Sequence, residues 1–322
     1  MTQVDELVAR VRAGDVRALA RAISLVENAA PDAAEVLSAC FPYTGKTLRV
    51  GVTGAPGAGK STLVDRLARM WRAAGSKVGV IAVDPTSPFT GGALLGDRIR
   101  MQEKLGDDGL YVRSMATRGS LGGLAGTTAD VAQVIEASGR DVVLIETVGV
   151  GQDEVEIVRL ADVTVVVLVP GMGDDVQSLK AGIMEIADIF AVNKADRDDA
   201  DRVEKEIRAM QSLAGSHEAW VTPVVKTVGT TGDGVDALFA AIGQRREWLM
   251  EDGRLEARRR EYWRARIDGM LQQALLKEAR SHGLSDAELG DHAAKVAVGA
   301  EDPYRLVPEL VARVFDARGG KR

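Results

Sequence analysis

The chain has 322 residues, 46% of them hydrophobic and 27% charged, which is ordinary for a globular protein with one large domain or two smaller ones. Its formal net charge of −6 argues against general nucleic-acid binding. Cys40 is the only cysteine, so an internal disulfide is excluded, and no apolar run is long enough to span a membrane. We therefore expect a cytoplasmic protein with neither a nucleic acid nor a membrane as its partner.

Residues 1–46 are rich in alanine and have the apolar spacing of helices. One apolar stripe covers residues 4–11, and a second covers residues 19–26. Asp32 predicts the start of a third helix, which should end near Cys40. We expect a helical N-terminal extension that packs on the core and takes no part in chemistry.

The next stretch has the pattern G-x-x-x-x-G-K-[ST] of a phosphate-binding loop. An apolar, strand-like run precedes it, and helical spacing follows from Ser61 to Ala74. Backbone N–H groups at the start of this helix can bind phosphate oxygens, Lys60 would reach the β- and γ-phosphates, and Ser61 would bind Mg²⁺. The predicted nucleotide-binding residues here are Gly54, Ala55, Pro56, Gly57, Ala58, Gly59, Lys60, Ser61 and Thr62.

Strand-like and helical runs alternate over residues 47–244. Most of the strand-like runs are continuous Val, Ile and Leu, as in parallel strands that are covered on both faces. We therefore predict the α/β class with a doubly wound, mostly parallel sheet, in which ligands bind at the carboxyl ends of the strands. The predicted strands are residues 48–53, 78–84, 110–113, 141–147, 163–169, 189–193 and 221–226.

Asp84 ends the second predicted strand and begins a loop with two prolines and two glycines. Its carboxylate is placed either to hold Mg²⁺ or to cap a turn, and position alone does not separate these two roles. Several arginines follow that can meet phosphate or a partner, and the pattern selects none of them. They are Arg98, Arg100, Arg113 and Arg118.

Glu146 follows four apolar residues at the end of another predicted strand. This arrangement is typical of an acid that organises Mg²⁺ and its waters beside a nucleotide. Gly149, three positions on, can offer its backbone N–H to a γ-phosphate. Gln152 and Asp153 are weaker candidates for positioning water. The later stretch Gly171–Lys180 predicts a mobile loop at the same sheet edge, or the start of a helix, and both can hold together.

The run Asn193-Lys194-Ala195-Asp196 directly follows an apolar strand and fits the guanine-reading pattern N-K-x-D. A carboxylate at Asp196 can accept hydrogen bonds from guanine N1–H and the 2-amino group. Adenine offers no such pair of donors, so we expect a buried Asp196 to favour GTP strongly over ATP. Lys194 can lie along the base, and Asn193 can tie the loop together.

The last predicted strand leads into three further candidate nucleotide-binding residues, Thr227, Val228 and Gly229. In GTPases, the loop at this place usually carries Ser-Ala and supports the base through its backbone. The Thr-Val pair here changes the side chains and leaves the backbone role open.

Residues 245–322 change in character and predict a long helix or helix pair, followed by one or two shorter helices. Trp263, Ile267 and Met270 share one apolar stripe. This stripe predicts either a contact with a second subunit or packing on the chain's own domain. The basic run Arg258–Arg260 is interleaved with glutamates, so we expect it to form a solvated face. The predicted organisation is therefore an extension (1–46), a nucleotide domain (47–244) and a C-terminal arm (245–322).

Four stretches together, Gly54–Thr62, Asp84–Pro88, Glu146–Gln152 and Asn193–Asp196, resemble those of one GTPase family. It is the family of methylmalonyl-CoA mutase-associated G-protein chaperones of the MeaB/ArgK type, and the resemblance covers nearly the whole chain. The resemblance implies a homodimer joined through the C-terminal arm. It also implies a partner, methylmalonyl-CoA mutase, whose adenosylcobalamin loading the chaperone gates and which it protects from inactivation, using GTP binding and hydrolysis.

The sequence thus predicts a GTPase with GTP or GDP and Mg²⁺ as ligands. Lys60, Glu146 and Gly149 are the predicted catalytic residues, and Ser61, Asp84 and Glu146 the predicted metal ligands. Two alternatives stay open. One is a metallochaperone GTPase for another metalloenzyme, although such a protein needs a thiol or imidazole cluster and the few candidates here are scattered. The other is a kinase that passes phosphate to an acceptor.

Overall fold

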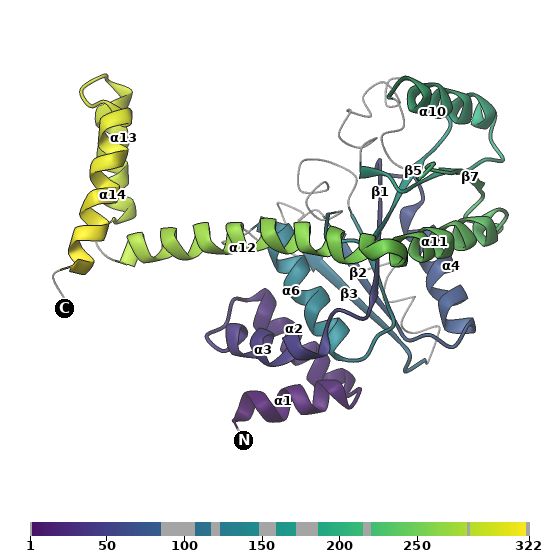
Figure 1. The fold of residues 1–322 in the computed structure, drawn as a ribbon, viewed down its shortest axis with the longest axis horizontal. Helices are drawn as coiled ribbons and strands as arrows, with labels where there is room; N and C mark the ends of the chain where they lie inside the picture. The colour runs from purple at the N-terminus through teal and green to yellow at the C-terminus, as the bar shows by residue number, and fades with distance from the viewer. Residues whose placement is uncertain are drawn as a thin grey trace. The chain divides into compact units, whose positions relative to one another are not determined.

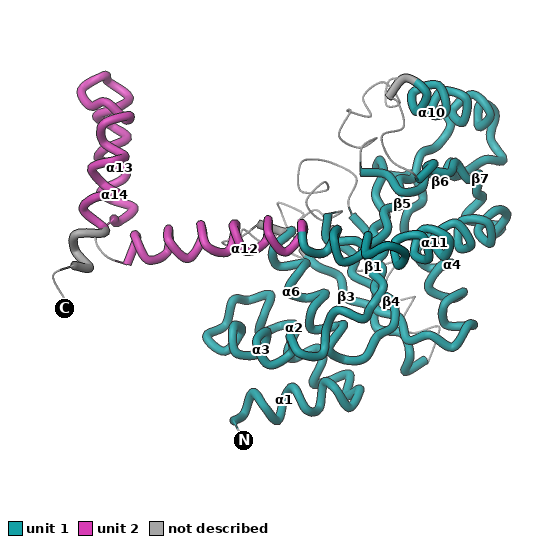
Figure 2. Tube along the Cα trace, in the orientation of Figure 1, with its two compact units in different colours: residues 1–260 teal, residues 261–322 magenta. Residues whose placement is uncertain are grey.

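The computed structural model describes residues 2–84, 107–116, 123–147, 159–171, 186–214, 220–281 and 284–319 (Figure 1). The chain divides into two compact units, residues 1–260 and residues 261–322 (Figure 2). The finer boundaries expected at residues 46 and 244 stay predictions.

Three helices form the N-terminal part of the first unit, as predicted: α1 (Gln3–Arg12), α2 (Val16–Glu27) and α3 (Ala33–Cys40), followed by the short helix η1 (Phe41–Tyr43). Helix α1 starts at a capping box in which Thr2 and Asp5 bond each other's backbone N–H. The side chain of Asp15 caps α2. The Gln133 side-chain amide of helix α6 (Gly123–Ala137) donates to the Leu37 carbonyl at 2.7 Å, so these helices pack on α6.

Seven parallel strands form the sheet, in the order β3-β2-β4-β1-β5-β6-β7, which confirms the predicted class. Strand β1 lies between β4 and β5, where successive connections leave in opposite directions, and such switch points bind ligands at their carboxyl ends. The strands are β1 (Leu48–Gly54), β2 (Val78–Asp84), β3 (Leu110–Ala116), β4 (Val142–Glu146), β5 (Val163–Leu168), β6 (Ile189–Asn193) and β7 (Val224–Thr227).

The last strand begins later than predicted, at Val224 rather than residue 221. Val221 is 82% exposed, and Pro223 has no N–H to donate to a neighbouring strand. Strand pairing with β6 therefore starts only after the proline.

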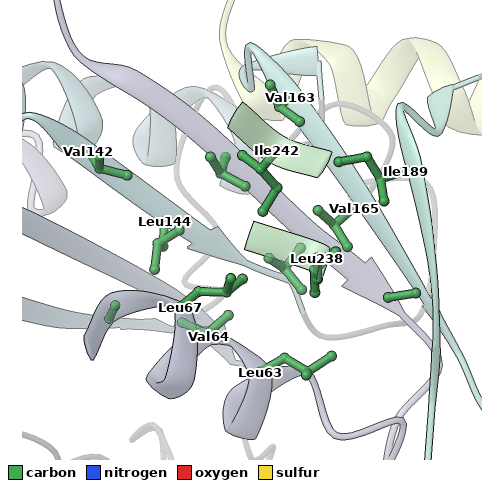
Figure 3. Packing of buried hydrophobic residues seen from close by; sticks show 14 of the residues in the cluster. Leu63, Val64, Leu67, Val142, Leu144, Val163, Val165, Ile189, Leu238 and Ile242 are labelled. Atoms are coloured by element: carbon green, nitrogen blue, oxygen red, sulfur yellow. The ribbon is translucent and has the colours of Figure 1, made fainter. Parts of the chain in front are cut away.

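Helices cover both faces of the sheet. Leu63 and Leu67 of α4 (Lys60–Ala73) and Leu238 and Ile242 of α11 (Val235–Met250) pack on strand residues such as Val165 in one buried cluster, as Figure 3 shows. On the opposite face, helix α10 (Ala200–Ala214) packs on β5 and β6. Helix α6 covers the same face, where its Ile135 lies against Gly79 of β2.

A short break, η2 (Glu251–Gly253), separates α11 from α12 (Arg254–Ser281). The segment from residue 245, expected as a long helix or a helix pair, therefore holds the end of α11 and one long helix. The start of α12 corrects one expectation, because Arg258 and Arg259 do not form a solvated face. Arg259 makes two hydrogen bonds to Asp162, at 2.9 and 2.8 Å, and Arg258 makes two to Asp188, at 3.1 and 3.0 Å. The sequence could not show this, because both acids precede strands far from the arginines along the chain.

The second unit, by itself, contains the rest of α12 and the helices α13 (Asp286–Ala297) and α14 (Pro303–Gly319). His292 on α13 contacts Glu301 at 2.7 Å, and Arg313 on α14 pairs with Glu288 at 2.6 Å. Several large apolar side chains are exposed here: Ile267, Met270, Leu271, Leu275, Tyr304, Val307 and Val311. Among the described residues, no helix has both the length and the apolar character needed to cross a bilayer.

Candidate functional site

The glycine-rich loop joins the carboxyl end of β1 to the start of α4, as the sequence predicted. Gly54 has φ 141°, and a Cβ there would lie 2.1 Å from the Val167 carbonyl oxygen of the neighbouring strand. Gly59 has φ 90°, and a Cβ there would lie 2.3 Å from the side-chain amide of Asn193. Only glycine fits both positions. Helix α4 begins directly after Gly59, so the loop lies at a helix N-terminus. The unpaired N–H groups and the dipole of this helix end favour a bound anion.

Lys60 is buried at the first position of α4. Its ammonium group donates to the carbonyl oxygens of Gly54 and Ala55, at 2.6 and 3.0 Å. The charge thus lies against the loop that would surround a phosphate. This places Lys60 where the sequence predicted a phosphate-binding lysine.

Two of the predicted metal-binding residues lie together. The Ser61 hydroxyl donates to Glu146 Oε1 at 2.5 Å, and Glu146 is 5% exposed at the end of β4. A hydroxyl oxygen and a carboxylate oxygen beside a phosphate loop are suited to Mg²⁺, which prefers oxygen ligands. Asp84 ends β2, next to β4 in the sheet, and its side chain lies outside the described part of the structure.

Asn193, at the end of β6, joins three segments through one buried side chain. Its amide nitrogen donates to the Ala58 carbonyl in the phosphate loop at 2.7 Å. Its amide oxygen accepts from the Thr227 hydroxyl at 3.2 Å and from the Gly229 backbone N–H at 3.0 Å. The predicted tie is therefore present, and it links the phosphate loop to both loops that would hold a base.

Lys194 follows with a left-handed backbone, φ 56°, which is uncommon for a residue with a side chain and typical of strained functional positions. Its ammonium group donates to the Gly57 carbonyl at 2.7 Å, above the phosphate loop. Lys194 therefore connects the loop after β6 to the phosphate loop, and its predicted place along a base stays a prediction.

Asp196 is exposed, which corrects the expectation of a buried carboxylate. Buried strands end at Asn193, and Asp196 lies three residues into the following turn. A base that binds here would itself remove this carboxylate from water. Selectivity would then depend on desolvation by the ligand rather than on a charge buried beforehand.

The loop after β7 is closed on itself, because Val228 N–H donates to the Asp233 carbonyl at 2.8 Å and Gly232 N–H to the Val228 carbonyl, also at 2.8 Å. Sequence reasoning missed a contact of this loop with Arg66 on α4, whose guanidinium donates to the carbonyls of Gly229 and Thr230. No short motif signals it, because the partners are backbone atoms far along the chain.

The other residues that the sequence singled out either have different partners or lie outside the described part of the chain. Arg113 on β3 pairs with Glu27 of α2, and this hydrogen-bonded pair raises the pKa of Arg113. Gly149, Gln152 and Asp153, most of the stretch 171–180, and the remaining candidate arginines lie outside the described residues. Their predicted roles stay predictions.

Comparison with known proteins gives consistent matches. The family model described as "Methylmalonyl Co-A mutase-associated GTPase MeaB" matches residues 19–283. A Pyrococcus horikoshii protein, provisionally named a GTPase, is 48% identical over 98% of this chain and 99% of its own length. The "Methylmalonic aciduria type A homolog, mitochondrial" of Mus musculus is 32% identical, over 98% of this chain and 80% of that protein.

A solved structure titled "Crystal structure of LAO/AO transport system kinase" covers 97% of this chain and 98% of its own, with a TM-score of 0.72 and 27% identity. The similarity of fold therefore extends over nearly the whole chain, helical ends included.

We predict that Asn193→Ala destabilises the first unit by about 3 kcal/mol, because it leaves the Gly229 N–H and the Ala58 carbonyl without their partner in a buried setting. Chemical denaturation followed by tryptophan fluorescence measures this. Asn193→Asp keeps the acceptor but places a buried carboxylate oxygen against the Ala58 carbonyl, so it should destabilise at least as much as Asn193→Ala. Equal stability of Asn193→Ala and the unmodified protein would contradict the role given to this side chain.

Proposed function

This chain belongs to the MeaB family of methylmalonyl-CoA mutase-associated GTPases, and from that premise we propose that it uses GTP binding and hydrolysis to assist a cobalamin-dependent mutase. Membership makes the chain a GTP hydrolase. The partner, the cofactor it handles and the residues of the site are our proposal.

One observation carries the assignment of the site. The Asn193 side chain bonds both the phosphate loop at Ala58 and the loop at Gly229, so a triphosphate end and a base end are held in one frame. Lys194, bonded to Gly57, spans the same gap. We assign the phosphates to residues 54–62 and the guanine base to Asn193, Lys194, Asp196 and residues 227–229.

The chain's own groups account for phosphate transfer to water as follows. N–H groups at the start of α4 and the Lys60 ammonium would bind the β- and γ-phosphates and stabilise charge as it moves onto the β–γ bridging oxygen. Ser61 and Glu146, with Asp84, would hold Mg²⁺, which when bound neutralises phosphate charge. Gly149 would donate its backbone N–H to the γ-phosphate. We expect slow turnover without a partner.

The mutase proposal is supported by the family description and by the similarity to the mouse protein along nearly the whole chain. We propose that methylmalonyl-CoA mutase is the partner and that the nucleotide state controls adenosylcobalamin loading. Pull-down with the GTP-bound, GDP-bound and nucleotide-free protein tests this. Capture of the mutase in a nucleotide-dependent manner is the expected result, and no capture in any state would refute the partner while leaving the GTPase intact.

We also propose a homodimer formed through the C-terminal arm. Its support is the row of exposed apolar residues on α12, among them Ile267, Leu271 and Leu275, since faces of this kind mark protein contacts. Leu271→Glu should convert a dimer into a monomer in sedimentation velocity. Gln273→Glu, an exposed neighbour on the same helix, should remain dimeric.

The described part of the site shows no feature specific to either alternative function, the metallochaperone or the kinase. Within the described residues, no group of three or more His, Cys, Asp or Glu side chains is arranged to hold a metal ion. Cys40 is fully buried, and burial raises the pKa of its thiol to about 11, which disfavours the thiolate that binds soft metals. The structural relative titled a kinase makes phosphate transfer worth measuring.

We predict that Lys60→Ala lowers GTP hydrolysis at least ~100-fold, because it removes the cation at the transferred phosphate.

Asp196→Asn should weaken GTP binding about 100-fold and improve binding of XTP, since the amide can donate to the xanthine 2-carbonyl. Calorimetry and release of labelled phosphate measure both. Equal binding of GTP and ATP by the unmodified protein, or label on an acceptor instead of free phosphate, would overturn the assignment.

A further inference from the structure

Arg66 lies on the phosphate-binding helix α4, about two turns after Lys60, yet its contacts are at the base end of the site. Its Nε donates to the Gly229 carbonyl at 3.0 Å, and its Nη2 donates to the Thr230 carbonyl. A Cβ on Gly232 would lie 2.9 Å from Arg66 Nη1, so the loop also lies directly against the guanidinium. One side chain therefore contacts three residues of the loop after β7.

These contacts hold Gly229 on both sides of its backbone. Its N–H donates to the Asn193 amide oxygen, and its carbonyl accepts from Arg66. The antiparallel bridge between Val228 and Asp233 closes the loop around this point. The Ala195 N–H also donates to the Thr227 carbonyl at 3.0 Å, where β6 pairs with β7. The loop is thus attached to β6 and the residues after it on one side, and to α4 through Arg66 on the other.

The chemistry of arginine suits this task. The guanidinium is a rigid, planar fork whose donors can bind two neighbouring carbonyls at once, and hydrogen bonds from a charged donor are stronger than neutral ones. Arg66 is half-buried, which limits competition from water. A lysine at this position could reach one carbonyl but could not fix the orientation of the loop.

The alternative is that Arg66 only stabilises the fold. Its neighbour Arg69 illustrates that ordinary role, because Arg69 pairs within α4 with Asp65 at 2.9 Å and makes no other hydrogen bond or ion pair to the described residues. Arg66 instead donates hydrogen bonds to the backbone carbonyls of Gly229 and Thr230, at the predicted base-binding loop. The position of Arg66 would therefore affect nucleotide binding, and not only the stability of α4.

We propose that Arg66 is a positioning residue for guanine selectivity, which holds the Thr227–Gly229 loop against the Asn193–Asp196 loop before nucleotide binds. This inference rests on the proposed guanine-binding function. Without Arg66, the loop loses its attachment to α4 and keeps its attachments to β6 and to the Ala195 N–H, so base binding would have to fix the position of Gly229 and Thr230. GTP, held at both ends, would lose affinity, whereas ATP, held mainly through its phosphates, would lose little.

The test compares Arg66→Ala, Arg66→Lys and the matched control Arg69→Ala for binding of GTP and ATP by calorimetry, with turnover at saturating GTP and a thermal melt. We expect Arg66→Ala to bind GTP about tenfold more weakly, a change of about 1.4 kcal/mol, with ATP binding and kcat nearly unchanged. The GTP-over-ATP preference should fall by the same factor. Arg66→Lys should lie between, and Arg69→Ala should match the unmodified protein.

Equal loss of GTP and ATP affinity, or an unchanged preference for GTP, would overturn the inference. If Arg66→Ala does not fold, Arg66→Lys decides, because it keeps the charge and the aliphatic stem and loses only the fork. If the unmodified protein itself shows no preference for GTP over ATP, then the proposed function fails, and this outcome is distinct from the failure of Arg66 alone.

Discussion

The side chain of Asn193 is the interaction on which the candidate site depends. One buried amide satisfies a carbonyl of the phosphate loop and, on its other side, a hydroxyl and an N–H of the loop after β7. Gly59 must lack a side chain because this amide occupies the space. The geometry of both ends of the site is therefore set by a group that would touch neither the transferred phosphate nor, necessarily, the base. A hydrogen-bonded amide suits this role because leaving any of its partners unpaired in a buried setting would be costly.

The carboxyl ends and the amino ends of the strands make different contacts. At the carboxyl edge, the ends of β1, β4 and β6 supply the phosphate loop, Glu146 and Asn193. Strand β4 lies next to β1 at the switch point, and β6 is separated from β1 by β5. At the amino edge, the acids that precede β5 and β6 form ion pairs with arginines of α12, and hydrogen bonding to Asp162 raises the pKa of Arg259. Asp162 also accepts the Arg49 backbone N–H of β1 at 2.9 Å. Ion pairs thus fasten the start of α12 to the same strands whose opposite ends form the site.

Family membership and the geometry of the site support different parts of the function. GTP hydrolysis follows from the family, and the phosphate loop, Glu146 and the N-K-x-D loop give it a physical basis. The mutase partner and the dimer are proposals that involve surfaces rather than the site. The exposed apolar side chains along α12, Ile267, Leu271 and Leu275, offer one such surface, because a row of this kind is unusual on a protein that acts alone.

The sequence alone determined the fold class, the order of strands along the chain, the phosphate loop and the N-K-x-D loop, because each depends on local spacing: continuous apolar runs, glycines before a helix, an acid at a strand end. Tertiary structure decided what local spacing cannot show. It brought Arg66 to Gly229, and Arg258 and Arg259 to Asp188 and Asp162, across long stretches of chain. It also left Asp196 exposed. Burial and the pairing of distant charges depend on how the layers pack, and that packing is a property of the whole sheet rather than of any one segment.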